Sequence, residues 1–473
     1  MASPSLCIEE LWICPPLAFA RFGQTEEPMV NFHWAPNDYK SRGTGETVIQ
    51  PTTTFNVGPD GMISAYLPTA IQFRDGANWR PVCPFFELHG RTSDGVSGPM
   101  TPERLGACGA GLSDVTWHIH TANRKAYHYT LSEGDQADAK VEIPGDCHDK
   151  TPLDGVSPEG AANPLILGDP VPLGAVQVIC PTNDWPELRL RVTPPKGHIY
   201  APTNTASRNL RALLPANQLT EDFLKEIGTI LNPASPWAKW KPVNDDPRTN
   251  PGGLYAQEPD GTSLGFFDDS SDGLIAVTIK GQDIAPAYAR FTCCPQDFQP
   301  DRRPFRSVSD GLTDLVAREA VSEPEFVEGA RWIETEMEIA DFMQRVRETM
   351  EASNLDHQNL RSLLANDGIT SVNPDYPFKP EPPRPGHPLP LTEIGRANHA
   401  RFLAYDVFRQ RMARRPDLLE RWIRNPAGEP TVYDRQMPAV MRGSDSYPMT
   451  ITQRQYNLMR SWLNVVSHQD TSK

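Results

Sequence analysis

Three carboxylates lie within five residues in the segment 265–273, where Asp268, Asp269 and Asp272 follow a Gly-Phe-Phe sequence. Clustered carboxylates can hold a hard cation, act as a general base, or bond backbone amides in a tight loop. A strand predicted from Leu274 to Lys280 would hold the cluster at its mouth. We therefore expect these carboxylates either to form a site or to have a structural role in the loop.

Two histidines stand in alternation in the sequence Trp117-His118-Ile119-His120. In a strand, side chains two residues apart line one face at a separation of roughly 6.6 Å, which suits a metal pair. A metal site needs a third and usually a fourth ligand, and no other histidine lies within this strand. We predict structural histidines and no metal, and keep His120 as a candidate site residue.

Other reactive side chains give weaker signals. The vicinal pair Cys293 and Cys294 at a strand end indicates burial of small side chains rather than redox chemistry. Tyr255 could serve as an acid or hydrogen-bond donor and is kept as a candidate. The sequence has no phosphate-binding loop, no His-Glu-x-x-His and no Gly-x-Ser-x-Gly, so common nucleotide and hydrolase chemistries lose support.

The region up to about residue 310 has the pattern of a β-rich body. Short apolar runs alternate with Asp-Gly pairs, which are typical of hairpin turns because glycine accepts positive φ. These pairs are Asp60-Gly61, Asp75-Gly76, Asp94-Gly95, Asp154-Gly155, Asp260-Gly261 and Asp272-Gly273. One segment, from Thr220 to Leu231, has apolar residues at helical spacing, and we predict a helix there.

After about residue 311 the apolar period becomes helical. A capping-box pattern at Ser322–Glu325 predicts a long amphipathic helix that continues to Met350. Two further helices are predicted at about 397–414 and 452–466, and a proline-rich strap at 373–390 must be extended. The fold class is therefore mixed β and α: a β-rich N-terminal domain at 1–310 and a helical C-terminal portion at 311–473.

Composition excludes several classes of function. The net charge of −15 would repel a nucleic-acid backbone. No apolar run is long enough to cross a bilayer, and Met1–Ala20 lacks the basic start of a secretory signal. Eight scattered cysteines without a C-x-x-C pair indicate reduced thiols. We expect a cytoplasmic protein with no membrane or nucleic-acid partner, for which a homo-oligomer is one possible assembly.

Several segments taken together, in this order, resemble the LodA-like family of cysteine tryptophylquinone oxidases, which includes lysine ε-oxidase and glycine oxidase. The segment 14–23 resembles the family's "IARxG" strand, with Ala20, Arg21 and Gly23 in the matching places. The segment 73–90 is similar to "FKDxxGxIKRQ…FRIYG", although Trp-Arg-Pro at 79–81 replaces the usual Lys-Arg-Gln.

The most specific match is the segment 117–129, which resembles "WxVHxANxKAxxY". It retains Trp117, His120, Ala122, Asn123, Lys125, Ala126 and Tyr129. The segment 265–273 resembles "GWxDDxxDGPV", and the segment 437–462 looks like "MPxxxGdn…LTxxQYxLLxxW". The resemblance covers residues 10 to 465 and adds Asn123 and Lys125 to the candidate site group of His120, Asp268, Asp269, Asp272 and Tyr255.

The resemblance implies oxidative deamination of a primary amine, such as the ε-amine of L-lysine, by a protein-derived cysteine tryptophylquinone. In the family the cofactor's cysteine and tryptophan follow the "QYxLLxxW" helix. Here 11 residues follow Trp462, and none is cysteine or tryptophan, so the precursors cannot be assigned and the chain is expected to stop before that segment. The implied partner is a small amine or amino acid, and the implied role could be tailoring of an amino-acid-derived metabolite. The alternative is a non-catalytic pseudoenzyme or binding scaffold.

Overall fold

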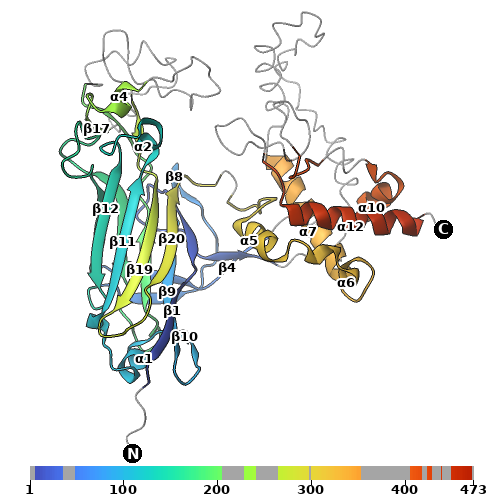
Figure 1. Ribbon diagram of the computed structural model, residues 1–473, viewed down its shortest axis with the longest axis horizontal. Coiled ribbons are helices and arrows are strands. Elements are labelled where there is room, and N and C mark those ends of the chain that lie inside the picture. The colour runs from blue at the N-terminus through green and yellow to red at the C-terminus, as the bar shows by residue number, and fades with distance from the viewer. Residues whose placement is uncertain are drawn as a thin grey trace, which may run out of the picture. The chain divides into compact units, whose positions relative to one another are not determined.

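The computed structural model describes residues 6–35, 48–204, 228–240, 265–297, 300–352, 405–417, 423–428, 438 and 449–470. The chain divides into two compact units. The first comprises Met1–His33, Gln50–Asp246 and Asn250–Phe298, and the second Trp34–Ile49, Pro247–Thr249 and Gln299–Lys473. The described part of the first unit is built mainly of strands and that of the second mainly of helices (Figure 1), which confirms the predicted mixed β and α fold class.

Two sheets make up most of the first unit. The larger has the order β1 (Ile8–Cys14), β9 (Phe85–Thr92), β15 (Arg189–Thr193), β14 (Val171–Val178) and β13 (Thr151–Gly155), with β10 (Ser97–Pro99) also paired to β9. The second has the order β12 (Ala137–Pro144), β11 (Val115–Asn123), β19 (Ser271–Ile279), β20 (Ala287–Cys294) and β2 (Leu17–Arg21). Neighbours are antiparallel except β2 and β20, which are parallel.

Smaller elements complete this unit. One short sheet has the order β17 (Gly228–Leu231), β16 (Ile199–Pro202) and β18 (Phe267–Asp268). Three strand pairs are β3 (Phe32–Trp34) with β4 (Ile49–Pro51), β5 (Thr54–Val57) with β6 (Ile63–Tyr66), and β7 (Arg74–Asp75) with β8 (Asn78–Trp79). The short helices are α1 (Pro102–Ala107), α2 (Lys125–Thr130) and α4 (Pro236–Lys239), and a 3-10 turn spans Leu112–Asp114.

The core of the first unit lies between the two large sheets. Along β11, every second side chain is buried, as expected for a strand with one face in the core. Trp117 on that strand is 1% exposed. Phe86 of one sheet and Phe291 of the other meet with ring centroids 6.5 Å apart, and both belong to one hydrophobic cluster. The two sheets therefore pack face to face through this cluster.

The Asp-Gly predictions have mixed outcomes. The pairs at 60–61, 75–76 and 94–95 lie in turns between paired strands, and each glycine has positive φ. The predictions at 154–155 and 272–273 are wrong, because these pairs lie inside β13 and β19. At position 273 the strand needs glycine for its lack of a side chain and not for a positive φ, because a Cβ on Gly273 would lie 2.1 Å from the Phe291 ring. The pair at 260–261 lies outside the described residues.

The helix predicted at 220–231 is wrong over its last four residues, and its residues 220–227 lie outside the described part. Gly228–Leu231 forms β17, which pairs in parallel with β16. Thr229 and Ile230 are β-branched and favour an extended backbone, and Leu231 is fully buried. Pairing and burial outweigh the helical spacing of the apolar residues.

The second unit contains α5 (Val308–Ala317), a 3-10 turn (Ala320–Ser322), α6 (Pro324–Val327), α7 (Trp332–Ala352), α10 (Tyr405–Arg414) and α12 (Gln453–Asp470). The prediction of a single helix from Ser322 to Met350 is wrong, because the chain leaves helical geometry between α6 and α7, around Gly329. Its predicted capping box is also absent, since Glu323 is the N-cap and no side chain caps it.

The remaining helix predictions agree with the described residues. The helix expected at 397–414 is α10 from Tyr405, and residues 397–404 and the proline-rich strap lie outside the described part. The helix expected at 452–466 is α12. Thr452 and Gln455 cap it mutually: the Thr452 N–H donates to Gln455 Oε1 at 2.8 Å, and the Gln455 N–H donates to Thr452 Oγ1 at 3.1 Å.

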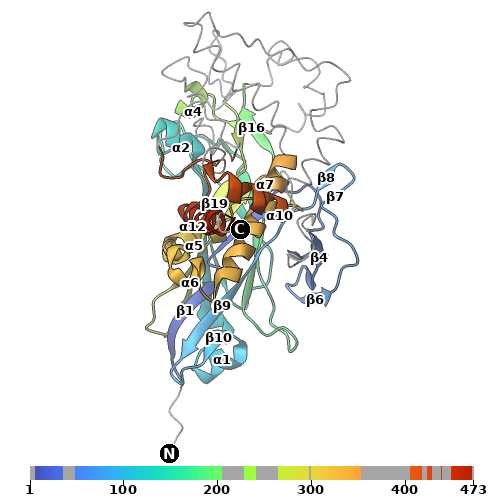
Figure 2. The same ribbon diagram turned by 90° about the vertical axis from the view of Figure 1, so that its right-hand side faces the viewer.

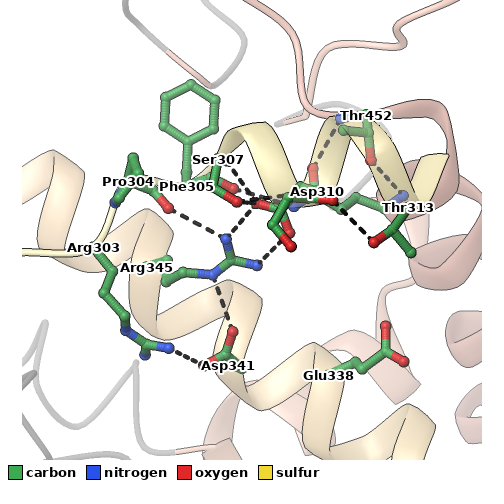
Figure 3. A network of polar contacts seen from close by, with 12 residues as sticks. Arg303, Pro304, Phe305, Ser307, Asp310, Thr313, Glu338, Asp341, Arg345 and Thr452 are labelled. Carbon is green, nitrogen blue, oxygen red and sulfur yellow. Dashed lines mark hydrogen bonds and ion pairs between the residues drawn. The ribbon is translucent and has the colours of Figure 1, made fainter. Parts of the chain in front are cut away.

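An arginine on α7, Arg345, connects this helix to the segment that contains α5 (Figure 3). Arg345 donates to Asp310 Oδ2 at 2.7 Å and to the Pro304 carbonyl at 3.3 Å, and it pairs with Asp341 Oδ2 at 3.0 Å. Burial alone would raise the pKa of Asp310, but the hydrogen bonds and charge of Arg345 outweigh burial and hold that pKa below its ordinary value. Asp310 also caps α5, since Ser307 and Asp310 form a capping box.

None of the described helices combines the length and the apolar composition that a bilayer span requires.

Candidate functional site

The carboxylate segment and the histidine strand meet at one end of the five-stranded sheet. β11 and β19 are antiparallel, and Ala122 pairs with Asp272, so the end of β11 lies beside the start of β19. α2 follows β11 directly, and β18 directly precedes β19. The structure thus brings together two segments that are about 150 residues apart in the sequence, and we treat this sheet end as the candidate site.

Asp268 is the centre of a polar cluster at this sheet end. Asn123 Nδ2 donates to the Asp268 carbonyl at 2.8 Å and to its Oδ1 at 3.1 Å, and Lys125 Nζ donates to its Oδ2. Ser270 Oγ donates to Oδ1 at 2.6 Å. Burial would raise the pKa of Asp268, but Lys125 and Ser270 outweigh burial and hold it below its ordinary value. Asp268 is therefore a carboxylate with fixed partners.

Asp269 has the opposite environment. Its side chain is fully buried, and Oδ2 accepts the backbone N–H groups of Gly197 at 3.1 Å and His198 at 2.9 Å. Among the described residues, Oδ1 has no hydrogen-bond partner. Burial, with a smaller contribution from the negative charge of Asp268, raises the pKa of Asp269 to about 7. This carboxyl group can hold or release a proton near neutral pH.

Two other weakly acidic groups adjoin Asp269. Burial, followed by the negative charge of Asp269, raises the pKa of Tyr200 far above its ordinary value. Burial also raises the pKa of Cys293 to about 12, so this thiol is protonated at neutral pH. The interior next to Asp269 is therefore a set of neutral, protonated groups.

The remaining predicted site residues lie elsewhere. Asp272 is exposed, and its Oδ1 accepts a hydrogen bond from Thr292 Oγ1 at 2.8 Å. His120 is half-buried on the outer face of β11, where Nε2 lies 2.7 Å from Asp138 Oδ2. Tyr255 lies outside the described residues. The structure therefore brings Asn123, Lys125 and Asp268 together, places Asp269 behind them, and leaves Asp272 and His120 on the outer face.

Both histidines face the same side of β11, as the sequence predicted. His118 Nδ1 lies 3.1 Å from Glu142 Oε1, and its Nε2 lies 3.0 Å from Thr278 Oγ1. Each imidazole thus has its own acidic neighbour. Within the described part of the chain, no group of three histidine, cysteine or acidic side chains is arranged to hold a metal ion.

Sequence reasoning missed the residues that surround the carboxylates. Gly197 and His198 lead into β16 and Tyr200 lies on it, and this part of the sequence has no motif of its own. The tryptophans Trp237 and Trp240 lie on and after α4, and the sequence Ser-Pro-Trp-Ala-Lys-Trp was a usable signal, since serine followed by proline is typical of a helix start.

No protein-family model and no curated protein sequence matches this chain. Among solved structures, the crystal structure of the L-Lys ε-oxidase from Marinomonas mediterranea matches with 14% identity and a TM-score of 0.43, covering 96% of this chain and 60% of that one. The chain is similar in structure to this oxidase. It spans about three fifths of the oxidase's length.

Two further structures of the same lysine ε-oxidase match at 14% identity. The Schiff base intermediate of the oxidase with L-Lys has a TM-score of 0.43 and covers 96% of this chain and 61% of that one. Another structure of the ε-lysine oxidase has a TM-score of 0.46 and covers 97% and 61%.

The tryptophylquinone that the resemblance implies does not fit the residues present. Trp462 of the "QYxLLxxW" segment is buried in α12, stacks on Phe408 at a centroid distance of 5.6 Å, and donates from Nε1 to Glu336 Oε1 at 3.2 Å. The eight cysteines are free thiols, and all of them precede Pro295. No Cys–Trp pair of this chain can be assigned to the cofactor, so no step of the chemistry is derived through it.

Proposed function

We propose that this protein acts on a small primary amine or amino acid by oxidative deamination, in the manner of lysine oxidase-like proteins. One observation carries the proposal. Three segments that resemble the family, 14–23, 117–126 and 265–273, contribute β2, β11 and β19 to a single sheet, with only β20 between β2 and β19. The family-like residues are therefore neighbours in space although they are far apart in sequence.

The side chains of these segments also contact one another or the next strand. Asn123 and Lys125 donate to Asp268, and Arg21 on β2 donates to Cys294 Sγ at 3.1 Å and to both carboxylate oxygens of Asp297 at 3.0 Å. The segments support each other's positions at this sheet end. This arrangement is what a preorganised site requires of its supporting residues.

The charges of this chain suit a cationic amine. The net charge of −15 favours the approach of positively charged small molecules. Asp268 provides a fixed negative charge, and Asp269 can take up or release a proton near neutral pH because its pKa is about 7. In the proposed reaction the amine loses two electrons and two hydrogens to oxygen, and water then releases ammonia, which leaves an aldehyde or keto acid and hydrogen peroxide.

A second candidate function is a non-catalytic binding scaffold, and one observation favours it. The motif side chains Asn123, Lys125, Asp268 and His120 all have internal partners, which is the environment of residues that hold a fold. A scaffold would keep the amine site without turnover.

Turnover separates the two functions. The protein isolated from its native source would be mixed with L-lysine, glycine or a simple alkylamine, and hydrogen peroxide and ammonia would be measured. The oxidase proposal predicts both products in equal amounts with at least one amine. Amine binding without either product would support the scaffold instead.

A further inference from the structure

Three aromatic side chains form a cluster beside the candidate site. Tyr129 on α2 contacts Trp237 with ring centroids 5.8 Å apart and Trp240 with centroids 5.1 Å apart. The two tryptophan rings are nearly parallel, at 16° and 6.3 Å. Trp237 is 3% exposed, whereas Tyr129 and Trp240 are half-buried. The cluster therefore has a buried base, Trp237, and two rings that are partly exposed, Tyr129 and Trp240.

This aromatic cluster of Tyr129, Trp237 and Trp240 belongs to the same sheet end as Asp268. Tyr129 follows Lys125 by four residues on α2, so the two side chains lie on one face of the helix. Gly265, three residues before Asp268, lies against Trp237. α2 and α4 lie side by side at one end of the first unit in both views (Figures 1 and 2).

The base of the cluster is held rigidly. Asp135 is fully buried and accepts hydrogen bonds from Ser235 Oγ at 2.7 Å and from the Trp237 backbone N–H at 3.0 Å. These bonds cap α4 at its first turn and place the Trp237 ring without depending on its indole nitrogen. The Asp135 side chain lies at the buried base of the cluster, beside the backbone of Trp237.

The indole nitrogen of Trp237 has no hydrogen-bond partner among the described residues, although it is fully buried. A buried donor without a partner is costly, and natural proteins rarely keep one without a partner such as water or a ligand. A Cβ added to Gly265 would lie 3.5 Å from this nitrogen. Glycine at 265 thus adds no side chain beside the donor.

Within the described part of the chain, no arginine or lysine is recorded over the faces of these three rings. The cation–ring contacts of the described residues involve other rings, those of Phe19, Trp79, Phe55, Phe85 and Phe326. The nearby ammonium group of Lys125 is paired with Asp268. A positive charge that rests on the half-buried faces can lie within about 6 Å of more than one ring centroid, which is the range of cation–π attraction.

We propose that Tyr129, Trp237 and Trp240 bind the side-chain ammonium group of an amino acid such as L-lysine, and that Trp237 Nε1 donates a hydrogen bond to an oxygen of the same ligand. The proposal rests on the proposed function for the class of ligand, a small amine, and adds the residues that recognise it. Aromatic faces and a nearby carboxylate attract an organic cation, and the unpartnered donor matches a carboxylate or carbonyl oxygen.

The test is calorimetric titration of the full chain with L-lysine, with L-norleucine as the control ligand because it lacks the side-chain ammonium group. Trp240→Leu removes the ring and keeps an apolar side chain, whereas Trp240→Phe keeps a ring. Trp185→Leu is the matched control, since Trp185 is another half-buried tryptophan of this unit, packed on Phe55. Circular dichroism confirms that each variant is folded.

We expect wild-type protein to bind L-lysine more tightly than L-norleucine. Trp240→Leu should weaken L-lysine binding by about three- to thirty-fold, Trp240→Phe by less, and Trp185→Leu not at all. The proposal is overturned if wild-type protein does not bind L-lysine, if both ligands bind equally, or if Trp240→Leu and Trp185→Leu have the same effect.

The proposed binding site and the proposed oxidase activity are tested by different measurements, so one proposal can fail while the other holds. Binding that depends on Trp240, without release of peroxide, supports the aromatic site and contradicts the oxidase proposal. Peroxide release with a KM that Trp240→Leu leaves unchanged supports the oxidase proposal and contradicts the aromatic site.

Discussion

Two neighbouring carboxyl groups, Asp268 and Asp269, have opposite electrostatic environments because they point to different surroundings. Asp268 meets an ammonium group and a hydroxyl, which stabilise its charge. Asp269 is fully buried and has only two backbone amides on one oxygen, which do not offset the loss of water. Sequence reasoning predicted a cluster of carboxylates here but could not distinguish the two, because the distinction depends on Lys125 and Gly197, which are remote in the chain.

The pKa of Asp269 predicts how stability depends on pH. The group is raised from 3.8 to about 7 on folding, so the folded state holds a proton that the unfolded state has lost in this window. The contribution of Asp269 to the free energy of unfolding is therefore largest below about pH 4. It falls by roughly 2–4 kcal/mol as the pH rises to about 7. Asp269→Asn cannot ionise, so its stability relative to wild type should increase across this window and then level off.

Urea unfolding of both proteins between about pH 4 and pH 8 measures this difference. Asp268→Asn is the matched control, and its stability relative to wild type should stay constant between about pH 4 and pH 8. The pKa of Asp268 is lowered on folding, so its contribution is present above the unfolded pKa and is lost as the pH falls. A stability difference for Asp269→Asn that stays constant over the whole window would contradict the environment described for Asp269.

At the scale of elements, the strands and helices with a strong period were predictable and the exceptions have local causes. β11, β20, α10 and α12 follow the spacing of their apolar residues within the described part of the chain. β17 does not, because pairing with β16 and burial of Leu231 decide its conformation. The Asp-Gly pair at 272–273 predicts a turn but lies in β19, because the sequence alone does not reveal that Phe291 occupies the space above Gly273.

Gly273 gives an element-scale prediction. Gly273→Ala places a Cβ 2.1 Å from the buried Phe291 ring, so β19 or β20 must shift, and we expect a loss of about 1–3 kcal/mol in the free energy of unfolding. Gly106→Ala is the matched control in the same unit: it lies in α1, is exposed, and has nothing within 4 Å of an added Cβ. It should stabilise the protein by about 0.5–1 kcal/mol.

Chemical denaturation followed by circular dichroism compares the two glycine variants. Equal stability of Gly273→Ala and wild type would mean that Phe291 does not fill the position above Gly273. A loss for Gly106→Ala as large as that for Gly273→Ala would show that the effect is not specific to the packed site.

At the scale of the whole molecule, the sequence predicts general properties better than it predicts which residues form a site. The acidic net charge and the division into β-rich and helical parts follow from the sequence alone. The aromatic cluster did not, because Tyr129 and the tryptophans of 237–240 are joined only when α2 packs on α4. Sequence predicts elements and their periods, whereas a site is made where remote elements meet.

The central proposal is oxidation of an amine, a reaction that needs an electron-accepting group on the protein, and in the resembling family this group is a tryptophylquinone. The most direct measurement is the intact mass, with peptide mapping, of the protein isolated from its native source under reducing conditions. The oxidase proposal predicts a mass that differs from the 52.6 kDa of this sequence, because the electron-accepting group of such an oxidase is carried covalently on the protein. A mass equal to that of the unmodified chain would contradict it.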